Sequence, residues 1–291
     1  MTVPGRALFL LLPLSALGCG GASPLLHPAH VLKQDQISVG SGVTSRVVFG
    51  TTRARIDAAQ AFAAANVIEN GDDEQTYIEG VLLRRSLEPT LSPWVGGRVG
   101  LGHQVEAGMS YTGHRIRIDG RYQLGDDLTA LSVGAAVNML LHQLETDSNL
   151  DGGSAGGGND QRLARESLDF SGTGWGFDLP VVLGTRRFSR WLEPSIGLRL
   201  GYERAFGNMM LTSDFPIGAH ATAEAQRFYG EGLIGLSAGS EVAFLRLELM
   251  MGLNRTLGVV DGIGSGAFPI RRNFAMETLS IQPSGALVFE F

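Results

Sequence analysis

The chain has 291 residues, a formal net charge of −6 and a single lysine, Lys33. It contains no run of basic residues, so the composition argues against a protein that binds nucleic acid. Cys19 is the only cysteine, which excludes an internal disulfide framework and a cysteine-rich metal site. The 41 glycines exceed the usual share of ~7%. They are spread through apolar stretches rather than collected in linkers.

Residues 1–18 have the features of a secretory signal peptide. Arg6 precedes an apolar run over 7–12, and small residues follow it. This run is too short to cross a bilayer, which needs ~20 residues. The stretch 15–19, Ser-Ala-Leu-Gly-Cys, resembles the cleavage box of bacterial lipoproteins. The resemblance implies that Cys19 is lipidated and delivered to the outer membrane; ordinary cleavage near Ala22 is the alternative.

Side chains alternate with a period of two from Trp94 onward, and no later segment reads as a transmembrane helix. In 115–124, for example, Arg115, Arg117 and Arg121 share one face, while apolar residues occupy the other. A soluble core does not bury such a charged face, whereas a barrel with a polar lumen does. Strands that cross lipid must also close on themselves to pair every backbone group. The sequence therefore predicts an all-β fold, a closed antiparallel up-and-down transmembrane β-barrel.

Ten strands are expected, with eight or twelve as alternatives. The expected ranges are 76–87, 94–102, 104–112, 114–124, 128–142, 168–184, 191–204, 224–238, 241–254 and 276–291. The first is the weakest because Glu79 and Arg85 share its lipid-facing side, and residues 43–50 are a further candidate strand. Pro180 and Pro283 are expected to mark a bulge or a strand end.

The connections between these strands differ in length in a regular way. Short connections at 103, 125–127, 185–190 and 239–240 all fall at one end. Long connections at 143–167, 205–223 and 255–275 all fall at the other end. Outer-membrane barrels have short periplasmic turns and longer outer loops. This division into short and long connections therefore predicts that the N-terminus and Cys19 lie on the periplasmic side.

Three regions follow from this reading: a signal peptide at 1–18, an N-terminal periplasmic segment at 19–75 and the barrel at 76–291. A short helix is expected over 57–68, with Asp57 as its N-cap. It would either plug the barrel or pack at the periplasmic mouth. The chain ends with Leu287, Phe289 and Phe291 in step. This ending resembles the terminal signal of outer-membrane barrels, which implies recognition by the machinery that inserts them.

Aromatic residues near the strand ends indicate contact with outer-membrane lipid, because aromatic girdles lie at membrane interfaces. The expected girdle residues are Trp94, Tyr111, Tyr122, Trp191, Tyr202 and Phe291.

The polar faces of the strands predict a lumen with nearly balanced charges. Its expected charged residues are Arg98, Glu106, Arg115, Arg117, Asp119, Arg121, Glu193, Arg199, Glu203, Arg227, Glu231, Arg246 and Glu248. This balance favours internal ion pairs and a mostly closed interior over a selectivity ring of one sign. A narrow pore is the alternative, in which the ladder of Arg115, Arg117 and Arg121 would favour anions.

Only weak signals for chemistry occur. Asp147, Asn149 and Asp151 match the first half of a calcium loop, but Gly158 stands where a bidentate Glu is expected. No other cofactor is expected. His142 lies near the outer rim, yet alternation points it inward and its nearest partner, Asp169, outward.

The leading interpretation is a non-enzymatic barrel in the outer membrane of a Gram-negative bacterium, with a structural, surface-interaction or narrow-pore role. The alternatives are an outer-membrane enzyme acting on lipid or peptide at the extracellular rim, and a soluble periplasmic barrel that binds an apolar ligand.

Overall fold

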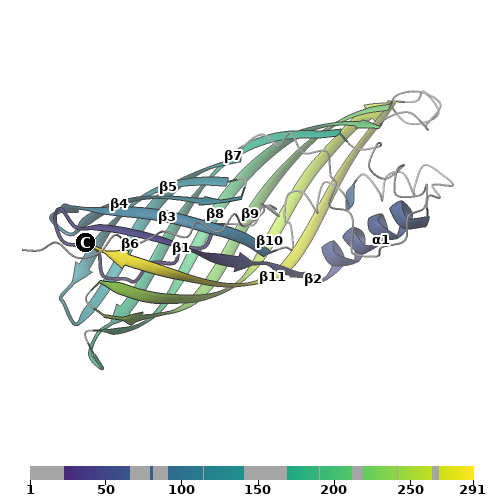
Figure 1. Cartoon of the computed structure of the whole chain (residues 1–291). Helices are drawn as coiled ribbons and strands as arrows, with labels where there is room; N and C mark the ends of the chain where they lie inside the picture. Colours follow the sequence, from purple (N-terminus) through teal and green to yellow (C-terminus); the bar gives the residue numbers. More distant parts are fainter. Residues whose placement is uncertain are drawn as a thin grey trace, which may run out of the picture.

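A closed ring of ten antiparallel strands forms the protein, with one short strand beside it (Figure 1). The computed structural model describes residues 23–65, 79–80, 91–113, 115–140, 169–189, 191–211, 219–240, 242–263 and 269–291. The ring runs through β1 (Ile37–Ser45), β3 (Leu91–Gly102), β4 (Val105–Thr112), β5 (Arg115–Gly125), β6 (Thr129–Leu140), β7 (Asp169–Thr185), β8 (Leu192–Leu211), β9 (Ala219–Gly239), β10 (Ala243–Ile263) and β11 (Pro269–Glu290). Pairing of β1 with β11 closes the ring, so the predicted closed antiparallel barrel of ten strands is confirmed.

The first strand of the ring is not the one expected. β1 pairs directly with β3, from Ile37 opposite Val99 to Ser45 opposite Leu91, which leaves no place between them for a strand at 76–87. The barrel wall therefore begins at Ile37 rather than at residue 76. Residues 79–80 are helical, and the rest of 76–87 lies outside the described residues. The signal in β1 is weak because small Gly and Ser residues fill much of its alternating pattern.

The helix α1 (Thr51–Ala65) begins at Thr51, earlier than the expected N-cap at Asp57. It follows β2 (Val47–Phe49), which pairs with β11. Ile56 of the helix packs with Val48 and Met276, whose side chain lies on the inner face of β11. Figure 1 shows α1 at the end of the barrel away from the chain's C-terminus and the short turns. The expectation that the helix packs at the mouth with the short turns is therefore wrong.

The outer face of the barrel is apolar over most of its height. Leu198 and Leu253 are 67% and 69% exposed, and each strand of the ring carries similar side chains outward. The rings of Trp175, Phe177 and Phe228 lie 5.0–5.7 Å from that of Tyr202, forming an outer aromatic cluster. Trp94 is an exception to the expected girdle, because its side chain is buried inside the barrel. Within the described residues, no helix is long and apolar enough to cross a membrane.

The strands differ greatly in length. β3 to β6 have 8–12 residues, whereas β8 to β11 have 20–22 and extend past them (Figure 1). Most of the loops expected at 205–223 and 255–275 are therefore strand. The sequence pattern did not predict these extensions because their outward side chains are mixed. Arg204 and Glu224 form an ion pair there, whereas Phe206 and Leu257 are apolar and exposed. An apolar period of two cannot identify a strand whose outer face mixes polar and apolar residues.

Both prolines mark interruptions of the ladder, as expected. Between β6 and β7 the paired register is broken around Pro180, which has no N–H to donate. Pro283 lies opposite the break between β1 and β2, where Arg46 leaves the ladder. Arg46 keeps the inward phase of its neighbours Thr44 and Val48, and its side chain is buried in the lumen.

Candidate functional site: the filled lumen

All thirteen charged residues expected in the lumen lie inside the barrel. Twelve of them are at most 6% exposed, and the side chain of Arg98 is 11% exposed. Three groups fill the interior: a cluster near the short turns, a layer of ion pairs farther along the strands, and the chain's own residues 23–36, called here the N-terminal segment.

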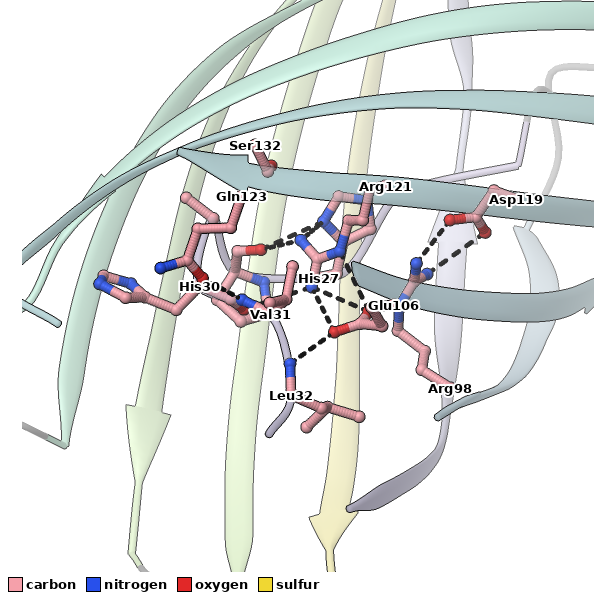
Figure 2. Close-up of polar contacts among 12 residues, drawn as sticks. His27, His30, Val31, Leu32, Arg98, Glu106, Asp119, Arg121, Gln123 and Ser132 are labelled. Carbon is pink, nitrogen blue, oxygen red and sulfur yellow. Dashed lines mark hydrogen bonds and ion pairs between the residues drawn. The ribbon is translucent and has the colours of Figure 1, made fainter. Parts of the chain in front are cut away.

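The cluster near the short turns centres on Glu106 of β4 (Figure 2). Its carboxylate accepts hydrogen bonds from Arg98 and from Arg121, whose Nε and Nη2 both lie 3.0 Å from it. Arg98 also donates to Asp119 at 2.5 Å. Burying these charges costs free energy unless each has a partner of opposite sign, and the cluster supplies one for every member.

A second group, the ion-pair layer, lies farther from the short turns. It comprises Arg46, Arg115, Arg117, Asp178, Arg199, Glu203, Arg227 and Glu231. Glu203 of β8 accepts from Arg115 of β5 and from Arg227 of β9. Glu231 of β9 binds Arg199 of β8 and also Arg46, at 3.1 Å, from the seam between β1 and β2. Some of these pairs join strands that are not neighbours, so the layer crosses the lumen.

The N-terminal segment lies in the lumen between these strands and is held mainly through its backbone. Glu248 accepts from the N–H of Leu25 at 3.0 Å and from that of Leu26 at 2.8 Å. Three further wall side chains accept the remaining bonds. Glu193 accepts from Ala29 and His30, Gln123 from Val31, and Glu106 from Leu32, at 2.7–3.2 Å. Figure 2 shows the last two of these contacts, from Val31 and Leu32.

Arginines of the wall bind the carbonyl groups of the same segment. Arg199 donates to the Ser23 carbonyl at 2.6 Å, and Arg246 donates to that of Leu26 at 3.2 Å. Arg121 donates to the carbonyls of Pro28 and His30. Bonds that involve a charged partner are roughly twice as strong as neutral ones. The lumen thus supplies hydrogen-bond partners for both the N–H and the C=O groups of the segment's backbone.

Two apolar clusters hold the side chains of the segment. Leu26 packs with Trp94, Ala286 and Val288. Leu25 and Ala29 pack in a second cluster, whose wall members are Ala130, Val182, Leu233 and Met250. These inward-facing apolar residues interrupt a polar lining. Their burial is favourable because apolar side chains of the segment cover them and remove them from water.

The backbone of the segment is constrained at Pro24 and Pro28 and strained at Leu26. Leu26 has φ = 46°, a left-handed conformation that is uncommon for residues other than Gly. Such strain persists only where the surroundings enforce it, and here both carboxylate oxygens of Glu248 hold Leu25 and Leu26. Pro24 and Pro28 favour extended geometry in the residue before each. They also have no N–H that would require an acceptor.

His27 is buried with its Nδ1 2.8 Å from Nη1 of Arg121. Because a guanidinium can only donate, the ring must accept through Nδ1 and be neutral. Burial and the charges of Arg121, Arg98 and Arg117 hold the pKa of His27 well below its usual range.

Little empty space remains around the segment. A cavity of about 100 Å³ lies between the segment and the wall near the short turns, lined in part by Lys33, Arg186 and Glu290. A second void of about 10 Å³ lies beside Leu26. The larger cavity has room for several waters and the smaller for about one.

Several residues expected to carry chemistry lie outside the described residues. They are Cys19, His142 and the calcium-loop residues Asp147, Asn149 and Asp151. Among the residues that are described, no group of three His, Cys, Asp or Glu side chains could hold a metal ion. Sequence reasoning missed Arg46 and the N-terminal segment. Trp94, Val182, Met250 and Val288 were the available signal, because they are apolar at positions that face inward.

Comparisons of the sequence and of the structure with known proteins gave different results. No protein-family model and no curated protein matches the sequence. The chain is similar to a major outer membrane protein from Thermus thermophilus, at 9% identity and a TM-score of 0.37, over 88% of this chain and 99% of that one. It is also similar to Neisserial surface protein A, at 12% identity and a TM-score of 0.29, over 88% and 97%. A third similar structure is the CymD monoaromatic hydrocarbon channel, at 8% identity and a TM-score of 0.31, over 95% and 94%. This level of similarity carries no argument about function.

Glu248→Ala should loosen the N-terminal segment. The substitution leaves two buried N–H groups without acceptors, at ~1–3 kcal/mol each. Because Lys33 is the only lysine, a lysine-specific protease cuts the folded chain at one bond, within the segment. Its cleavage rate should rise by roughly tenfold or more. Glu277→Ala removes an exposed carboxylate and is the matched control. Equal rates for the two variants would contradict this role for Glu248.

Acid should also weaken the hold on the segment. When the segment lies in the lumen, the charged form of the His27 imidazole is disfavoured. Binding of the segment is therefore strongest above the ordinary histidine pKa of about 6.5, and it weakens as the pH falls below that value. Amide protection at Leu25 and Leu26, corrected for intrinsic exchange, should fall between about pH 7.5 and about pH 5.5. His27→Asn removes the titrating ring and should flatten the fall. An equal fall in both proteins would assign the acid response to other groups.

Proposed function

We propose that the protein is a non-enzymatic barrel of the Gram-negative outer membrane, with a structural or surface-interaction role and a lumen that is closed at rest. The single observation that carries the proposal is the division of the wall into an apolar outer face and an inner face of paired charges. A soluble barrel that binds an apolar ligand would require the opposite arrangement.

The strand dimensions support a membrane location. A transmembrane strand needs ~9–11 residues, and β3 to β6 have 8–12. On the longer strands, the outward residues change from apolar at Leu200 to charged at Arg204, with Tyr202 of the aromatic cluster between them. Aromatic residues at such a boundary are typical of a membrane interface.

The contents of the lumen support a closed barrel rather than a pore. The ion-pair layer crosses the interior, and the N-terminal segment occupies the part nearer the short turns. Breaking a buried pair by removing one partner costs ~3–5 kcal/mol, so passage of a solute would have a high barrier. The narrow-pore role expected as an alternative therefore receives no support from these contacts.

The export signals belong to the same proposal. A signal peptide at 1–18 and lipidation at Cys19 would deliver the chain to the outer membrane, and the terminal Phe291 would serve its insertion into the bilayer. Phe291 is 69% exposed and exchanges backbone hydrogen bonds with Ile37. The residue that the insertion machinery would recognise thus also lies beside the pairing of β1 with β11 that closes the barrel.

Leu198→Arg should destabilise the barrel in lipid. Leu198 projects from the middle of the apolar face, where a charge costs ~2–4 kcal/mol. Chemical unfolding in lipid vesicles measures the loss. The control, Asn273→Arg, adds the same charge at an exposed position on the polar extension of β11, where the cost should be close to zero. If both variants lost equal stability, the apolar face would not lie in lipid.

The wild-type protein should conduct no ions in a planar bilayer. Its insertion is verified separately by the faster migration of the unboiled barrel on a gel, so that silence cannot be mistaken for a failure to insert. Regular stepwise conductance from the inserted wild-type protein would overturn the closed lumen and restore the pore role.

A further inference from the structure

We propose that the lumen is a binding site for a peptide backbone, and that the N-terminal segment is its resident occupant. The site would accept a separate peptide with two adjacent bulky aliphatic residues and a small residue three positions later. This inference rests on the proposed closed barrel, because it takes the segment to be the normal content of the lumen.

The strongest support is that recognition runs mainly through backbone groups. Wall side chains accept from the N–H groups of six residues, Leu25, Leu26 and 29–32. They donate to the carbonyls of four, Ser23, Leu26, Pro28 and His30. Every peptide carries these groups, so the contacts do not depend on which side chains the peptide has. Peptide-binding proteins commonly gain affinity from the main chain in this way.

Side-chain selectivity comes from the two apolar clusters. One encloses Leu26 beside Trp94 and Val288, and the other encloses Leu25 and Ala29. The second cluster demands a small side chain at the position of Ala29, because the site passes close to Gly184. A Cβ at residue 184 would lie 2.8 Å from the Cβ of Ala29. Pockets for a few side chains beside a bonded backbone give specificity to such sites.

Covalent attachment explains why the segment would exclude competitors. It joins β1 through the short turn at residues 33–36, where Asp35 donates to the carbonyl of Gly100. A ligand tethered this closely has an effective concentration in the millimolar range. A free peptide would therefore bind the wild-type barrel poorly and an emptied barrel well.

Lys33 allows the site to be emptied without changing the wall. In protein made without the lipid, as Cys19→Ser, cleavage after this single lysine converts the resident segment into a free peptide, which dilution and washing remove. The double variant Leu25→Asp/Leu26→Asp provides a second route, since it places carboxylates in the apolar clusters and beside Glu248. Both forms are checked for the folded barrel by gel migration before use.

The probe is a fluorescent peptide with the sequence of residues 23–33, and fluorescence anisotropy measures its binding. Emptied barrels should bind it at micromolar concentration, and the intact wild-type protein at least about tenfold more weakly. Replacing both leucines of the peptide with serine should weaken binding by about tenfold or more. Methylating the backbone nitrogens of the two leucines should weaken it similarly, and so should Glu248→Ala in the wall. Glu277→Ala should have no effect.

The proposal is overturned if the folded, emptied barrel binds the probe no better than the serine peptide. It is also overturned if the backbone-methylated peptide binds as well as the probe. These failures are separate from failure of the proposed function, which is tested by conductance of the intact wild-type protein. A closed wild-type barrel whose emptied form binds no peptide would leave the closed barrel standing and remove only the peptide site.

Discussion

The pairing of charge inside a sealed wall is the constraint on which the rest of the structure depends. Alternation sends one face of every strand into an enclosed lumen, where an unpaired charge is far more costly than at a surface. Most arginines there meet carboxylates of other strands. Among the described residues, Glu248 accepts no hydrogen bond from an arginine and binds instead the N–H groups of Leu25 and Leu26. The N-terminal segment therefore completes the electrostatics of the barrel.

The same constraint explains how much of the fold could be read from the sequence. The nine strands β3 to β11 and the inward direction of residues such as Arg115 and Glu203 follow from a period of two, whereas the expected tenth strand at 76–87 is replaced in the ring by β1. The pattern is reliable because a slip of one residue would put arginine in lipid. The two prolines were also informative, since a missing N–H interrupts a ladder wherever it occurs.

Other parts of the fold could not be predicted from the period of two. β1 was missed because its glycine and serine residues make its two faces similar. The extensions of β8 to β11 were missed because their outer face mixes polar and apolar residues. Trp94 was assigned to the outer girdle from its residue type, although its phase, shared with Arg98, points inward. The N-terminal segment has no periodicity at all, since its partners are single side chains spread over the ring. Its only trace in the sequence is the set of wall residues, such as Val182 and Met250, that are apolar where their neighbours are polar.

The unequal strands shape the face that the protein presents beyond the lipid. Only about half of the 20–22 residues in each of β8 to β11 is needed to cross a hydrocarbon core, which takes ~9–11. In the proposed membrane location, the remainder would stand outside the bilayer, and its ladder is intact, as the pairing of Arg204 with Gln226 and of Leu257 with Ala275 shows. In that location, a partner that met the side of the extension would contact side chains that a hydrogen-bonded sheet holds in register.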